Sequence, residues 1–230
     1  MASGNPICVA LDTPDLVRAE ALARMLKGRV GYLKLGMEFF YVHGAAGYET
    51  VARHGVPIFL DLKLHDIPNT VASGLKSLMR LQTLPAIVNV HATGGFDMMK
   101  AACDAVEGRA KLIAVTILTS LSSTDIHAAG FDRARETGAH AVALAQLARS
   151  AGLDGVVCSP REVAEIKAAT VPGFLTIVPG IRPLDASAGD QKRIATPQAA
   201  LAAGADILVI GRPITSAEDP AGAAETILDG

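Results

Sequence analysis

Eight short apolar runs alternate with eight helical segments along this 230-residue chain, and the alternation limits its possible folds more than any other feature. The runs, rich in β-branched residues and leucine, predict strands at 7–12, 30–36, 57–63, 86–92, 111–118, 154–159, 174–180 and 206–211. Helical patterns occupy 14–27, 38–53, 67–82, 95–107, 137–151, 160–169, 196–203 and 219–228. This order, without a linker, indicates one parallel (β/α)8 barrel domain, a TIM barrel, over residues 1–230. A doubly wound open sheet is the main alternative.

Polar side chains collect where the predicted strands end. Because side chains alternate along a strand, residues two apart share a face, so Leu60 and Leu62 are expected to face the helices. The opposite faces carry Asp12, Lys34, Asp61, Lys63, Asn89 and His91. Barrel enzymes build their active sites at the C-terminal ends of the strands, and the sequence therefore predicts an active site there.

The stretch FLDLKLHDIPNT, residues 59–70, concentrates charge beside this predicted site. In one interpretation Asp66 begins a helix ahead of a proline, while Asp61 and Lys63 form an ion pair at a strand end. In the other, Asp61 and Lys63 point into the barrel, where a network or a ligand must satisfy them. Lys34, at the equivalent depth on the preceding strand, then completes two cations and two anions, a cluster suited to shifting pKa values for proton transfer.

Two later segments, PGIRP and VIGRP, have features of an anion site. Barrels often bind phosphate in the loops after the seventh and eighth strands. Gly211 would let the backbone approach an anion, and Arg182 and Arg212 would supply forked donors, although single arginines at strand ends are often surface residues. The small, polar segment 180–195, which includes Gln191, has the composition of a mobile lid.

Hydroxyls and one histidine add weaker signals. Thr119 and Ser120, after the fifth strand, could read the edge of a heterocycle, and residues 119–136 are expected to carry a short helix. His91 could be a base, but a structural hydrogen bond is the favoured interpretation. The other histidines show no metal-ligand spacing with acidic partners, so they are predicted to be non-catalytic.

Composition excludes several classes of protein. The formal net charge is −2 with no block of like charges, and aromatic residues make up 4%, which argues against nucleic-acid binding and a polybasic membrane patch. No apolar run approaches the roughly 20 residues that cross a bilayer, and MASGNPICVALD is not a signal peptide. Cys8 and Cys158 lie in apolar runs, as small core residues of a reducing compartment do. The sequence thus predicts a cytoplasmic protein.

One motif makes the pattern recognisable. Asp-x-Lys-x-x-Asp-Ile-Pro-x-Thr at 61–70 resembles the signature of the orotidine 5′-phosphate decarboxylase family. VALD, LKLG, NVHATGG, VTILTS, PGIRP, AGDQKR and VIGRP resemble segments of the bacterial members in the same order, so the likeness covers essentially the whole chain.

The resemblance implies a carboxy-lyase that converts orotidine 5′-monophosphate to uridine 5′-monophosphate and CO2, the last step of de novo pyrimidine biosynthesis, without a metal or organic cofactor. It implies a catalytic array of Lys34, Asp61, Lys63 and Asp66, with Lys63 donating a proton to C6. It also implies a homodimer, with these binding residues: Asp12 and Lys34 for the ribose, Thr119 and Ser120 for the pyrimidine, Arg182, Gln191 and Arg212 for the phosphate and base, and Asp66 and Thr70 reaching the partner's site.

Two rivals remain. A metal-dependent sugar-phosphate decarboxylase or aldolase of the same barrel superfamily resembles the chain at Asp-x-Lys-x-x-Asp, but such relatives carry an acidic metal ligand where this sequence has Lys34. A nucleotide sensor without catalysis is the other rival, although carboxylates facing an anionic ligand gain nothing for simple binding.

Overall fold

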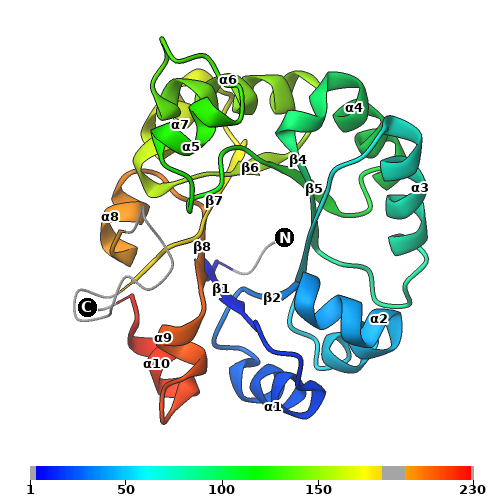
Figure 1. Cartoon of the computed structure of the whole chain (residues 1–230). Helices are drawn as coiled ribbons and strands as arrows, with labels where there is room; N and C mark the ends of the chain where they lie inside the picture. Colours follow the sequence, from blue (N-terminus) through cyan, green and yellow to red (C-terminus); the bar gives the residue numbers. More distant parts are fainter. Residues whose placement is uncertain (1–3, 183–194, 229–230) are drawn as a thin grey trace.

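The chain folds into a closed barrel of eight parallel strands in sequence order, as described by a computed structural model for residues 4–182 and 195–228. Figure 1 shows the strands as a central ring enclosed by helices. The strands are β1 (Ile7–Ala10), β2 (Tyr32–Gly36), β3 (Ile58–Leu64), β4 (Ile87–His91), β5 (Lys111–Val115), β6 (Gly155–Val157), β7 (Leu175–Val178) and β8 (Ile207–Ile210). Because β8 pairs with β1, the predicted barrel is confirmed and the open sheet is wrong.

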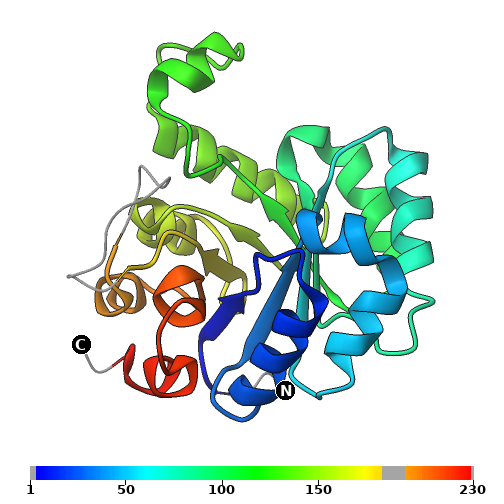
Figure 2. The same ribbon diagram turned by 60° about the horizontal axis from the view of Figure 1, so that its bottom comes forward.

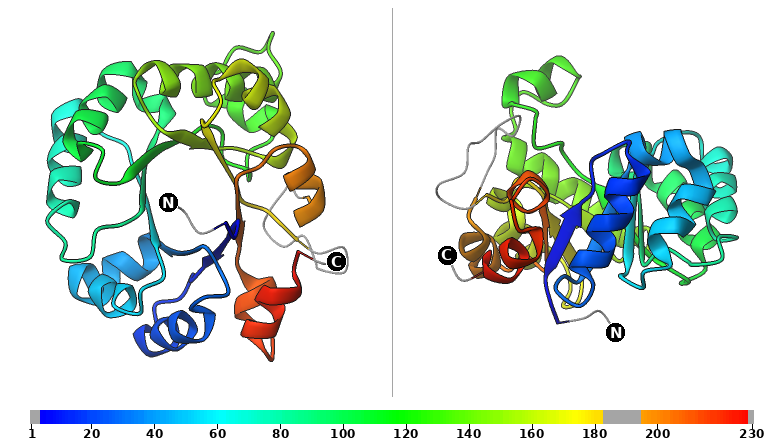
Figure 3. Two further views of the ribbon diagram at one scale, coloured as in Figure 1. Left: turned by 180° about the vertical axis from the view of Figure 1, so that it is seen from behind. Right: turned by 90° about the horizontal axis from the view of Figure 1, so that it is seen from below.

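Helices connect the strands and form the outer layer, which the view from behind in Figure 3 also shows. They are α1 (Leu16–Leu26), α2 (Met37–Ala52), α3 (Pro68–Leu78), α4 (Gly95–Val106), α5 (Ser123–Ala128), α6 (Thr137–Ser150), α7 (Val163–Ala169), α8 (Pro197–Ala202), α9 (Arg212–Thr215) and α10 (Pro220–Thr226), with 3-10 turns at Ala92–Gly94 and Pro160–Glu162. No described helix is both long enough and apolar enough to cross a membrane.

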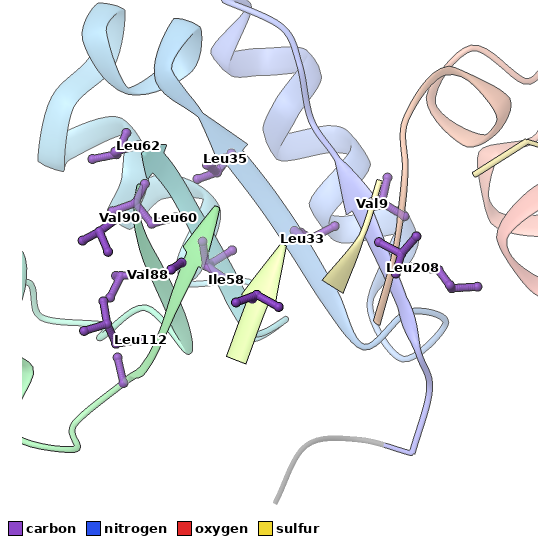
Figure 4. Close-up of a cluster of buried hydrophobic side chains, with 14 of the residues drawn as sticks. Val9, Leu33, Leu35, Ile58, Leu60, Leu62, Val88, Val90, Leu112 and Leu208 are labelled. Atoms are coloured by element: carbon purple, nitrogen blue, oxygen red, sulfur yellow. The ribbon is translucent and has the colours of Figure 1, made fainter. Parts of the chain in front are cut away.

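Alternation along the strands divides the core into two layers. Residues of one face pack against the helices; Figure 4 labels Leu33 and Leu35 of β2 and Leu60 and Leu62 of β3 among them. The other face fills the barrel with a separate apolar cluster: Cys8, Ala10, Tyr32, Phe59, Ile87, Ile113, Ile177, Ile207 and Val209. The polar residues at the strand ends continue this inner face, so the predicted facing of the strands is confirmed.

Several boundaries differ from expectation. The strand expected over 111–118 ends at Val115, and the helix expected over 67–82 ends at Leu78. The four-residue helix α9 directly after β8 was not expected, because it is too short to show helical periodicity.

The excursion after β5 carries the predicted short helix. α5 stands away from the barrel, in the green segment at the top of Figure 2. Its start has a capping box: Ser122 accepts from the Asp125 backbone N–H, and the Asp125 carboxylate accepts from the Ser122 N–H.

The predicted lid has two described ends. Beside β7, the Arg182 N–H donates to the Ala195 carbonyl oxygen at 3.0 Å, which closes the base of the excursion. Gln191 and the rest of 183–194 lie outside the described residues. Cys8 and Cys158 are buried, as predicted, and neither forms a disulfide among the described residues.

Candidate active site

A cavity of about 830 Å³ opens at the C-terminal ends of the strands. Most of the residues predicted for a site line it: Asp12, Lys34, Asp61, Lys63, Thr119, Ser120, Arg182, Gly211 and Arg212. They come from strands or strand ends spread around the barrel, so the closed sheet brings together positions that are up to 200 residues apart in the sequence.

One wall of the cavity is a chain of alternating charges that extends from β1 to β3. The Lys34 ammonium donates to Asp12 Oδ1 at 2.9 Å and lies 3.3 Å from Asp61 Oδ2. The Lys63 ammonium donates to Asp61 Oδ1 at 2.7 Å. The charges thus alternate in the order Asp12, Lys34, Asp61 and Lys63, with opposite charges in direct contact at each step.

The strand register corrects one expectation about this wall. Lys34 pairs with Phe59, whereas Asp61 pairs with Gly36, so Lys34 starts two residues lower in the barrel than Asp61. The prediction of equivalent depth was wrong. The long lysine side chain rises to the level of the carboxylates instead, and only its ammonium meets them.

Burial and charge together determine the ionisation of the wall. Burial alone would raise the pKa of Asp61, but Lys34 and Lys63 outweigh it, and the pKa of this carboxyl lies below its ordinary value. Burial alone would lower the pKa of Lys34, but the carboxylates of Asp61 and Asp12 raise that pKa above its ordinary value. Both groups are therefore charged at neutral pH.

Sequence reasoning placed Asn89 on the inner face but gave it no role in the site. Its side chain is buried in β4, donates to Asp61 Oδ1 at 2.7 Å, and accepts from the Lys63 backbone N–H at 2.8 Å. The signal available in the sequence was one amide in the otherwise apolar run IVNV. A polar side chain in such a place needs partners, and here the partners are charged site residues.

Two arginines line another part of the cavity, which adjoins this wall because β8 pairs with β1. Arg182 follows β7 and Arg212 follows β8, and both line the cavity together with Gly211. Thr119 and Ser120 line it from the end of β5. The cavity therefore has a paired-charge wall at β1 to β3, a cationic region after β7 and β8, and hydroxyls after β5. Figure 1 shows where these strands lie in the ring.

Asp66 and Thr70 do not line this chain's cavity. Both are exposed at the start of α3, and the Asp66 carboxylate accepts from the adjacent Ile67 N–H at 2.7 Å. Of the predicted array, Lys34, Asp61 and Lys63 are thus in contact within one chain, and Asp66 lies apart from them.

The histidines form no metal site in the described part of the chain. His91 lies beside His65, with ring centroids 5.6 Å apart, and burial together with the positive neighbours His65 and Lys63 lowers the pKa of His91. Across residues 4–182 and 195–228, no three His, Cys, Asp or Glu side chains are grouped so as to hold a metal ion.

Comparisons with known proteins all indicate the same family. The sequence matches the model of the "Orotidine 5'-phosphate decarboxylase / HUMPS family" over residues 5–227. It is 53% identical over 223 residues to orotidine 5'-phosphate decarboxylase of Novosphingobium aromaticivorans, and 49% identical over 231 residues to that of Paramagnetospirillum magneticum, with 97% of each chain covered in both cases. The fold superposes on the crystal structure of orotidine 5'-phosphate decarboxylase from Lactobacillus acidophilus with a TM-score of 0.84, at 37% identity and 98% coverage of each chain.

Proposed function

We propose that this chain, which belongs to the orotidine 5'-phosphate decarboxylase / HUMPS family, decarboxylates orotidine 5′-monophosphate to uridine 5′-monophosphate. The reaction would be the last step of de novo pyrimidine biosynthesis. One observation carries the proposal: the alternating charges of Asp12, Lys34, Asp61 and Lys63 line the same cavity as Arg182 and Arg212. That arrangement suits a substrate with a reacting anion at one end and a phosphate at the other.

Lys63 is proposed to stabilise and then protonate the reacting carbon. The bond between C6 and the carboxylate breaks, CO2 leaves, and the electron pair stays on C6 as a carbanion. The Lys63 ammonium, fixed on Asp61 Oδ1, opposes that charge and transfers a proton to C6; solvent then returns a proton to the amine.

Asp61 is proposed to aim the ammonium and to face the departing carboxylate. Its pKa lies below its ordinary value despite burial, so it is an anion in the site that the substrate enters. Repulsion between the two carboxylates would raise the energy of the bound substrate relative to the transition state, a contribution that disappears as CO2 leaves.

Other residues that line the cavity are proposed to bind the parts of the substrate that do not react. Arg182 and Arg212 would hold the phosphate through forked hydrogen bonds, with Gly211 allowing close backbone approach. Thr119 and Ser120 would contact the pyrimidine edge, and Asp12 with Lys34 would hold ribose hydroxyls. Interactions with the phosphate can then assist a reaction at the other end of the nucleotide.

We also propose a homodimer whose sites are shared. Asp66 and Thr70 lie outside their own cavity, and Ile67 between them has an exposed fraction of 67%. Further exposed apolar side chains stand on α2 and α4: Met37, Tyr41, Val42 and Phe96. A second copy covering this apolar face would receive Asp66 and Thr70 next to its own charged wall.

The metal-dependent sugar-phosphate reaction is less consistent with the site. An ionised Lys34 stands on β2, at the position where relatives with that chemistry are expected to carry an acidic ligand. The relatives compared above are, by name, decarboxylases of orotidine 5'-phosphate.

The test is the loss of orotidine 5′-monophosphate absorbance with purified protein in EDTA. Turnover in EDTA with uridine 5′-monophosphate as product supports the proposal. Absence of turnover would contradict it and favour a binding protein, and turnover that requires added magnesium would favour the metal-dependent reaction.

A further inference from the structure

Asn89 makes two hydrogen bonds that join Asp61 and Lys63 of the charged wall. Its amide oxygen accepts from the backbone N–H of Lys63, and its amide nitrogen donates to the Asp61 carboxylate. The side chain is about 1% exposed and does not line the cavity, so it does not contact a ligand there directly.

The backbone of Lys63 explains why such a contact is needed. Its φ of +51° lies in the left-handed region, which is unfavourable for a residue with a long side chain. The β3–β4 register also shifts here: Leu60 pairs with Val88, and the next pair is Leu64 with Val90. Residues 61–63 of β3 therefore lie opposite a single residue of β4, Asn89.

This bulge changes the direction of the Lys63 side chain and removes its N–H from the regular strand pairing. A buried N–H without a partner would cost about 1–3 kcal/mol. Asn89 supplies the missing acceptor from its side chain, and the same amide group reaches the carboxylate two residues earlier in β3.

The chemistry of the partners allows one orientation of the amide. The backbone N–H can only donate, and an ionised carboxylate can only accept. Oδ1 must therefore face Lys63 and Nδ2 must face Asp61. A carboxylate at this position would keep the acceptor and lose the donor, and an aliphatic side chain would lose both.

We propose that Asn89 is a positioning residue that holds Lys63 in its left-handed conformation and aims the Asp61 carboxylate at the Lys63 ammonium. The proposal rests on the proposed decarboxylation, in which these two groups face the substrate. Asn89 acts through them and touches no reacting atom.

Three variants separate the two hydrogen bonds. Asn89→Leu removes both with a side chain of the same branching, Asn89→Asp removes only the donor, and Thr176→Val is the matched control. Thr176 is buried and donates to Asp206 Oδ2 at 3.0 Å near the start of β7, so its loss costs a similar bond at the opposite end of the barrel.

Asn89→Leu is expected to lower kcat about 100-fold, the effect of misplacing a catalytic group by about 1 Å. The Kd for uridine 5′-monophosphate should change less than about threefold, because Asn89 contacts Asp61 and Lys63 and neither of the arginines proposed to bind the phosphate. Thr176→Val should lower the melting temperature and leave kcat per folded enzyme unchanged. A kcat of Asn89→Leu within about threefold of the original enzyme would overturn the proposal.

Asn89→Asp makes a distinct prediction about pH. Two carboxyl groups 2.7 Å apart share a proton, and the protonated form can still donate to Asp61. The charged or titratable groups near position 89 are Asp61, Lys63, Lys34, His65 and His91, while β5 places Ile113 beside it. These groups are common to both proteins, so the ratio of variant to original kcat isolates the new carboxyl.

That ratio should fall as pH rises, by up to tenfold per pH unit above the pKa of the carboxyl pair. A ratio that is flat from pH 5 to pH 9 would overturn the donor role toward Asp61. Should Asn89→Leu fail to fold, Asn89→Ala carries the same prediction for kcat, and the isosteric aspartate still supplies the pH test.

A readout without turnover keeps this inference distinct from the proposed function. Hydrogen exchange of the Lys63 amide, followed by NMR, should be slow in the original protein and in Asn89→Asp and fast in Asn89→Leu. If the original protein fails to decarboxylate the nucleotide, the proposed function falls while this measurement still decides whether Asn89 holds Lys63. An amide that stays protected in Asn89→Leu would overturn the positioning role.

Discussion

Replacing Lys63 by alanine removes the one group to which the proposed mechanism assigns both charge stabilisation and proton donation. The ammonium donates to Asp61 Oδ1 at 2.7 Å, and its side chain is about a quarter exposed, toward the cavity. Alanine leaves the Asp61 carboxylate with its contacts to Lys34 and Asn89, so that carboxylate keeps two of its three partners.

The expected loss follows from the charge. A cation about 4 Å from a developing carbanion contributes about 4 kcal/mol at an effective dielectric near 20. At about 1.4 kcal/mol per tenfold, its loss lowers kcat about a thousandfold. Loss of the proton donor adds to this, because general acid catalysis typically contributes 10²–10⁴-fold. We therefore expect a decrease in kcat of at least about a thousandfold.

The assay is the decrease of orotidine 5′-monophosphate absorbance in EDTA, with the binding of uridine 5′-monophosphate measured in parallel. Lys111→Ala is the matched control, because Lys111 also stands on a strand and pairs with an aspartate, Asp154, at 2.6 Å. It begins β5, at the end of the barrel away from the cavity. The control should keep full activity, and Lys63→Ala should keep product binding.

The result that would refute the reasoning is a Lys63→Ala enzyme with near-normal kcat. Such an enzyme would show that neither the charge nor the proton of Lys63 is needed for the reaction. Loss of product binding together with activity would instead show that the lysine supports the pocket, which also contradicts the assigned role.

Three further predictions concern the partner subunit, the phosphate and pH. Mixed Lys63→Ala and Asp66→Asn chains should regain part of the activity, since one site in a heterodimer carries neither change; complete failure of well-mixed heterodimers would argue against shared sites. Arg212→Ala should lower kcat/KM for the nucleotide about 10- to 150-fold, equivalent to about 1.5–3 kcal/mol for a charged hydrogen bond, and should leave turnover of the phosphate-free nucleoside unchanged. Because the folded protein lowers the pKa of Asp61, its ionised form favours folding above the ordinary value of 3.8, and this contribution disappears as pH falls through the lowered pKa. The destabilisation by Asp61→Asn, measured by urea unfolding, should therefore be larger at pH 7 than below pH 3.8, and an equal loss at both would contradict the assigned ionisation.

The order of eight strands and eight helices predicts the barrel, and the alternation of side chains along β3 predicts the inward direction of Asp61. The period of two assigns each residue to a face, and a barrel has one interior. The same rule could not show the bulge in β3, because LDLKL alternates regularly in the sequence while the pairing with β4 shifts after Leu60. The left-handed backbone of Lys63 follows from that pairing and has no local sequence signal such as glycine.

The relative depth of two side chains in the barrel could not be predicted from the sequence either. The sequence predicts Lys34 level with Asp61, but register depends on how two strands are offset against each other, which neither strand encodes alone. The contact between Asn89 and Asp61 has the same origin, since it crosses between strands 28 residues apart.

The closed ring of strands has a consequence for which ligands can be accepted. Lys63 stands on β3, and Arg182 follows β7, which lies across the ring of strands from β3 (Figure 1). The width of an eight-stranded barrel is determined by strand number and stagger, so no substitution in a loop can change it. The fixed width therefore sets the length that a ligand needs in order to contact both groups of residues at once. A shorter fragment that reaches one group does not reach the other.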